Sequence, residues 1–188
     1  MSGFIARRLW GLAVAVALLE GVSGVALRAE EKELSDRAVT LLMQYAWQLT
    51  PNRFVTPQGK TIEVDKSQRA SVAIPTDSAR EVIRVARMTA HAEICGLEQE
   101  QQANFQTLMR REQAKAKWSD QQMLYINQLH LFTVMALTGK IKAEAGGKEN
   151  PLPKVERTTC SDSERREVQQ RIMAYVNANA PEPPPQRR

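Results

Sequence analysis

His91 and Cys95 lie four positions apart in the stretch MTAHAEICGL, residues 88–97. On a helix this spacing puts both side chains on one face, so an imidazole and a thiol would meet. Such a pair has the chemistry of a metal site or of a cysteine–histidine nucleophile. A nucleophilic pair also needs a third group that orients the histidine. The alternative is that Cys95 is half of a disulfide and that His91 takes no part in chemistry.

The N-terminus is typical of a secretory signal peptide, predicted over residues 1–24. Two arginines precede a mostly apolar run, Leu9–Leu19, which is shorter than the ~20 residues that a bilayer span needs. Cleavage is expected after Gly24, with cleavage after Ala29 as the alternative. An uncleaved membrane anchor stays open as a second interpretation. We expect a periplasmic or secreted protein without a transmembrane helix after cleavage.

The chain contains two cysteines, Cys95 and Cys160, the minimum for one intramolecular bridge. Exported proteins form and keep such bridges because their compartments are oxidising. Each cysteine is expected at a helix boundary, where a bridge ties two elements without disturbing either helix. The sequence therefore predicts a Cys95–Cys160 disulfide, which would remove the thiolate that metal binding or nucleophilic attack requires.

A small-ligand or metal site near His91 and His130, with Glu93 as a carboxylate, is the alternative use of these side chains. A zinc site needs four ligands, or three and a water. The chain offers two histidines and two cysteines, without a CxxC or HExxH motif. His130 also stands in the apolar stretch NQLHLFTVM, where a neutral, hydrogen-bonded histidine is ordinary core. We therefore expect no metal and no cofactor.

Other sequence features argue against enzymes and nucleic-acid binding. There is no GxSxG motif and no glycine-rich phosphate loop. The formal net charge of +5 falls to +4 without the signal peptide, which carries two arginines and one glutamate. Positive and negative residues are well mixed, and no lysine- and arginine-dense stripe suits a phosphate backbone. We expect neither catalysis nor a nucleic-acid partner.

Composition and periodicity predict a mainly all-α fold, a compact bundle of about five helices in a single domain over residues 34–178. One helix follows the cap Ser35 and ends before Pro51, and a second, with Asp77 or Ser78 as its cap, covers residues 78–95. Helices over 98–117 and 120–138 and one after Ser161 complete the bundle. Serine capping boxes are expected at Ser119–Gln122 and Ser161–Glu164. Residues 179–188 are expected to be a proline-rich disordered tail.

Side-chain patterns assign a core face to each later helix. The helix over 120–138 is apolar nearly all round, so it should be central and wrapped by the others. The helix before it should bury Phe105, Leu108 and Met109. The last helix should bury the stripe Val168, Ile172, Tyr175 and Val176.

Residues 51–76 interrupt the helical pattern. TIEVD (61–65) and ASVAIP (70–75) predict a small β-hairpin whose strands pair across KSQR. Loops positioned by rigid helices often contain the residues that bind a partner. If exposed, its apolar side chains would be candidate contacts for a partner; otherwise they cover the bundle. These side chains are Phe54, Val55, Ile62, Val64 and Ile74.

The stretches AHAEICGL and KWSDQQMLYINQLHLFTVMALTGK, followed by a lone cysteine before a charged helix, resemble uncharacterised small exported proteins of alpha-proteobacteria. The resemblance implies a bacterial envelope setting, and it carries no activity and no functional residues. Together with the export signal, it favours a non-catalytic helical protein that binds a protein partner in the cell envelope, as an adaptor or chaperone-like factor. A thiol redox enzyme is the third and least favoured class.

Overall fold

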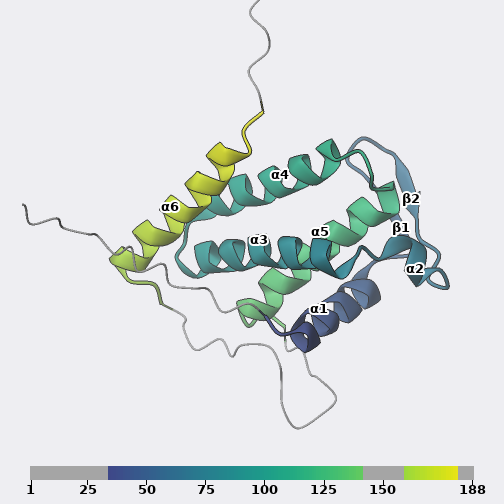
Figure 1. The fold of residues 1–188 in the computed structure, drawn as a ribbon, viewed down its shortest axis with the longest axis horizontal. Helices are drawn as coiled ribbons and strands as arrows, with labels where there is room; N and C mark the ends of the chain where they lie inside the picture. The colour runs from purple at the N-terminus through teal and green to yellow at the C-terminus, as the bar shows by residue number, and fades with distance from the viewer. Residues whose placement is uncertain (1–33, 142–158, 182–188) are drawn as a thin grey trace, which may run out of the picture. The chain divides into compact units, whose positions relative to one another are not determined.

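A computed structural model describes residues 34–141 and 159–181 of the chain. The mainly helical fold and the hairpin between the first two long helices are confirmed (Figure 1). The predicted signal peptide, most of the loop before the last helix and most of the tail lie outside the described residues. The elements are α1 (Asp36–Leu49), β1 (Arg53–Val55), β2 (Thr61–Glu63), α2 (Arg69–Val72), α3 (Thr76–Ile94), α4 (Glu98–Ala114), α5 (Asp120–Leu137) and α6 (Asp162–Ala178).

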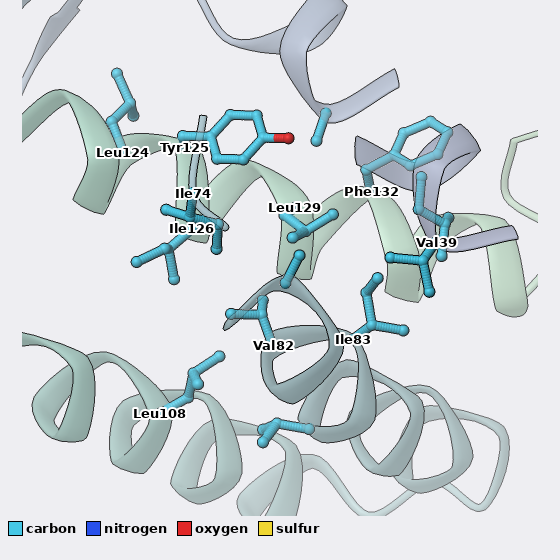
Figure 2. Packing of buried hydrophobic residues seen from close by; sticks show 14 of the residues in the cluster. Val39, Ile74, Val82, Ile83, Leu108, Leu124, Tyr125, Ile126, Leu129 and Phe132 are labelled. Carbon is cyan, nitrogen blue, oxygen red and sulfur yellow. The ribbon is translucent and has the colours of Figure 1, made fainter. Parts of the chain in front are cut away.

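Helix α5 is the centre of the described fold, as its composition predicts. It packs against α1, α2, α3, α4 and β2. Its buried side chains face several neighbours, so they do not form a single stripe (Figure 2). Within the described residues, no helix is long and apolar enough to cross a membrane. The central core combines Leu124, Tyr125, Ile126, Leu129 and Phe132 of α5 with Val82 and Ile83 of α3, Val39 of α1 and Leu108 of α4.

The helix ends follow local rules, with one correction. Ser35 caps α1, and both predicted serine capping boxes are present, at Ser119 and Ser161. The expected cap of the second long helix is wrong: α3 begins at Thr76, and Pro75 precedes it without a side-chain bond. Proline is tolerated at this N-cap because a residue before the helix donates no helical hydrogen bond, while its carbonyl oxygen accepts from the Ala79 N–H at 2.9 Å.

Helix α4 is shorter than expected and ends at Ala114, not at Lys117. Ala116 adopts φ +50°, which no helix can continue through. Of its predicted core face, Leu108 is buried, whereas Phe105 and Met109 are half-buried. Helix α6 likewise buries Val168 and Ile172 fully and Tyr175 and Val176 in part.

The hairpin pairs different segments from those predicted. β1 and β2 are antiparallel, with Phe54 opposite Ile62. The turn lies at TPQGK, residues 56–60, before TIEVD, because this stretch holds the proline and the glycine that a tight turn uses. The second predicted strand is wrong: Arg69–Val72 is the one-turn helix α2, which places Val72 in the core.

Candidate functional site

Cys95 and Cys160 form a disulfide, as the sequence predicts. Their Cα atoms are 4.9 Å apart, and the bond spans a sequence separation of 65. Cys95 is the C-cap of α3, and Cys160 directly precedes Ser161, the N-cap of α6. Since both sulfurs are bonded, neither cysteine offers a thiolate, and the suggested pair with His91 has no nucleophile.

Apolar and polar contacts surround the disulfide. Leu97, between α3 and α4, packs with Cys95 and with the buried Val168 and Ile172 of α6. The Arg165 guanidinium donates hydrogen bonds to the carbonyl oxygen of Cys95 at 2.8 Å and of Gly96 at 3.4 Å. A cation is favourable there because the carbonyls at a helix C-terminus carry partial negative charge. The start of α6 is thus attached to the end of α3 by a covalent bond and by hydrogen bonds from a charged side chain.

His130 belongs to a buried polar cluster where α3, α4 and α5 meet. Its Nε2 lies 3.0 Å from the hydroxyl oxygen of Thr89. The Asn104 amide nitrogen donates to that hydroxyl oxygen at 2.8 Å and to the carbonyl of Val85 at 2.9 Å. The Phe105 ring packs on the imidazole with centroids 4.9 Å apart. Each of three helices therefore contributes one polar member, and the cluster joins them.

Burial determines the charge of this cluster. Loss of water contact lowers the pKa of His130 to about 4, so the imidazole is neutral at neutral pH. The Thr89 hydroxyl accepts from Asn104, and its proton can go to His130 or to its own helix carbonyl at Val85, 3.2 Å away. The Oδ1 atom of Asn104 is buried without a hydrogen-bond partner among the described residues. The arrangement is that of a hydrogen-bonded core histidine.

The other two predicted ligands, His91 and Glu93, are not members of the hydrogen-bonded cluster around His130. His91 is half-buried near the end of α3, and Glu93 forms an ion pair with Lys140 at 2.9 Å. Across residues 34–141 and 159–181, no three His, Cys, Asp or Glu side chains are grouped so that they could hold a metal ion. The idea of a ligand site near His91 and His130 stays a prediction.

The five apolar residues proposed as a contact surface divide by burial. Val64 and Ile74 are core residues, 4% and 3% exposed. Phe54 and Ile62 are half-buried and pack against the same core cluster. Val55 is 53% exposed and is the one of the five that a partner could reach freely. Four of the five therefore pack on the helical bundle, as the alternative to a partner-binding surface expected.

Glu112 is a buried carboxylate that the sequence analysis did not single out. Its side chain is 2% exposed. It accepts hydrogen bonds from Lys115 at 2.7 Å, Arg111 at 3.1 Å and the indole of Trp118 at 2.9 Å. Burial by itself would raise the pKa of Glu112, but bonds from Lys115, Trp118 and Arg111 outweigh it and hold the pKa below its usual value. The carboxylate is therefore ionised and fully partnered.

A signal for the missed polar residues was present. Asn104, Leu108 and Glu112 follow one another at intervals of four, so they share one face of α4. Leu108 was identified as core, and its two neighbours on that face are buried as well.

No protein-family model, curated protein or solved structure matches the chain. The candidate site consists of the disulfide with its surroundings, the buried cluster around His130 that joins α3, α4 and α5, and the Glu112 cluster that joins the end of α4 to the turn before α5.

Proposed function

We propose that this chain is an exported protein that acts in the periplasm or outside the cell by binding another protein, without catalysis. The Cys95–Cys160 disulfide carries the proposal. Such bonds persist in oxidising compartments and are rare where cellular reductants keep thiols reduced. The basic and apolar residues 1–24 support the same compartment, because they have the pattern of a signal peptide.

The buried polar groups support a role other than catalysis. A general acid or base works best with a pKa near the operating pH. The pKa of His130 is about 4, and that of Glu112 is held below its usual range. At neutral pH both groups stay in one protonation state, and both are hydrogen-bonded to neighbours that belong to the fold.

Leu49 and Val55 supply the contact that we expect a partner to use. Among the described residues, four large apolar side chains are exposed: Leu49, Val55, Leu131 and Met173. Leu49, 51% exposed, ends α1, and Val55 ends β1 only six positions later. Contiguous exposed apolar side chains are a feature of protein-binding surfaces, so we propose that the segment that Leu49 and Val55 bound is the one that a partner contacts.

The first experiment measures the intact mass of the protein from the envelope fraction of its native cells, denatured and alkylated without reductant. A chain that begins near residue 25 and carries no alkyl group supports export and an oxidised Cys95–Cys160 pair. An uncleaved chain with two alkylated cysteines contradicts the compartment and the proposal that depends on it.

The second experiment tests binding in the same cells. A photo-crosslinking amino acid replaces Val55, and the matched control carries it at Gln113, which is exposed on α4. We expect one adduct of defined mass at position 55 and none at 113. Equal adducts at both positions, or none at either, argue against a specific contact at the end of β1.

A further inference from the structure

Helix α6 is held to the described fold by little apolar packing. It packs against α3 and α4 (Figure 1). Two of its 17 residues, Val168 and Ile172, are buried. A helix in a protein gains most of its stability from an apolar face packed on its neighbours. The face of α6 is narrow, so other ties must matter for its position.

Near the C-terminal end of α6, the half-buried Tyr175 packs on the central cluster, with the Arg111 guanidinium 5.7 Å from its ring centroid. The other polar ties of α6 lie towards the disulfide. Arg165 binds the carbonyl oxygens of Cys95 and Gly96. Further along α6, the Gln169 amide reaches Glu100 at 2.5 Å, but this contact is exposed to water. Exposed polar contacts contribute little because water competes for them. The disulfide is the strong tie, since it keeps α6 at a high effective concentration beside α3 and α4.

We propose that the Cys95–Cys160 disulfide is a redox-controlled link that holds α6 over an apolar face of the bundle. In the oxidised protein, Val168 and Ile172 cover Ala92 and Leu97. When a dithiol reductant opens the bond, α6 separates and this face becomes accessible, while α1, α3, α4 and α5 stay packed through the central core. The inference concerns the fold itself and does not depend on the proposed function.

Exposure of the two cysteine residues sets the order of the reaction. Cys95 is 7% exposed, whereas Cys160 is half-buried. A thiolate of the reductant attacks the Cys160 sulfur, forms a mixed disulfide and expels Cys95 as a thiolate, which takes up a proton. The second thiol of the reductant then releases Cys160, and the reductant leaves as its own disulfide. Two electrons and two protons pass to the protein, which ends with two thiols.

The selectivity of the effect follows from where the core lies. The large cluster around α5 takes its buried members from α1, α3, α4 and α5 and the segment between β2 and α3, and α6 adds only the half-buried Tyr175. The smaller cluster around the disulfide contains all the fully buried residues of α6. Loss of the bond therefore acts on the smaller cluster first.

Hydrogen exchange with mass spectrometry on the full chain tests the proposal, with dithiothreitol as the reductant. After reduction, we expect amides of residues 165–178 to exchange at least tenfold faster, while those of α3 and α5 keep their rates. Unchanged exchange in α6 would overturn the link, because the bond would not be holding the helix. Equal acceleration in all helices would also overturn it, because α6 would not open separately.

A double variant distinguishes loss of the disulfide from other effects of dithiothreitol on the protein. Cys95→Ala with Cys160→Ala should show the fast α6 exchange without dithiothreitol and no further change when it is added. A double variant with α6 as protected as in the oxidised protein contradicts the proposal. Should the double variant fail to fold, the reduced natural chain still gives the deciding comparison, because it needs no substitution.

Discussion

The indole Nε1 of Trp118 donates a hydrogen bond of 2.9 Å to Oε2 of Glu112, across the turn that joins α4 to α5. The acceptor carboxylate is almost fully buried. Between the two residues, Lys115 binds the same carboxylate, and Ala116 adopts the left-handed conformation that ends the helix. The turn is therefore held by one carboxylate that binds groups on both sides of the helix end.

Replacing Glu112 by Gln should lower the free energy of unfolding at pH 7 by about 2 kcal/mol, because two cations lose a buried acceptor. The loss stays moderate since Arg111 and Lys115 are partly exposed and can reach water. Urea unfolding measures it. The pKa of Glu112 is lowered in the fold, so its stabilisation is present above the usual carboxyl pKa and is lost as pH falls through the folded value.

The control for that variant is Glu167→Gln on α6, where the side chain is 61% exposed and its contact with Arg171 is 3.9 Å long. It should change stability by less than about 0.5 kcal/mol. Equal effects of the two substitutions would contradict a special role for the buried carboxylate.

Ala116→Gly should leave the protein as stable or up to about 1 kcal/mol more stable. Ala116 has φ +50°, which costs energy for any residue with a Cβ atom and little for glycine. The greater freedom of glycine in the unfolded chain offsets part of the gain. Thermal unfolding with the same substitution at Ala103, inside α4, gives the comparison. There glycine should destabilise, and a loss of the same size at 116 would be inconsistent with the turn geometry.

Thr89→Val should lower the free energy of unfolding by about 1–3 kcal/mol, because it leaves buried atoms of Asn104 and His130 without a partner. Thr133→Val is the matched control. Thr133 is also buried, and its hydroxyl donates to the carbonyl of Leu129 in its own helix, so among the described residues it joins no second helix. Chemical denaturation of both variants should show the larger loss at position 89, and a larger loss at 133 would speak against the cluster.

Acid should weaken the fold through His130. Its pKa is about 4 in the folded protein and 6.5 in its ordinary state, so between these pH values the unfolded chain binds a proton that the folded chain does not. The unfolding free energy should therefore fall as pH drops from 6.5 towards 4, by about 3 kcal/mol in all from this group. Urea titrations at pH 7.5 and 4.5 should show a smaller fall for His130→Gln. The same fall in both proteins would exclude His130 as the cause.

Short-range signals in the sequence were sufficient for most of the helices. Ser119 and Ser161 set helix starts through atoms three residues away, and Gly96 follows the predicted end of α3 with φ +64°. The cysteine pairing was predictable because two cysteines allow one pairing. These features depend on neighbouring residues or on simple counts.

Other features depend on tertiary contacts that no local pattern contains. The segment 70–75 has β-forming residues, yet Val72 and Ile74 reach the core through a helical turn and an extended residue. Asn104 and Glu112 are buried because partners on other segments satisfy them, namely Thr89 on α3 and Trp118 after α4. Polar residue types suggest solvent. The spacing of Asn104 and Glu112 from Leu108 puts them on the core face, but only the structure shows the partners that make their burial possible.

The central place of α5 has a consequence for the order in which the chain can fold during synthesis or export. Helix α1 and strand β2 both pack on α5. Polar contacts also join the hairpin to the start of α5, because Lys60 forms an ion pair with Asp120 and the Gln121 amide donates to the carbonyl oxygen of Glu63. α5 is not complete until residue 137. A chain that emerges N-terminus first therefore has α3 available to cover part of α1 once residue 94 is made, but the face of α1 that packs on α5 stays uncovered until α5 has been synthesised. This interval is when the protein is most exposed to aggregation and to chaperones.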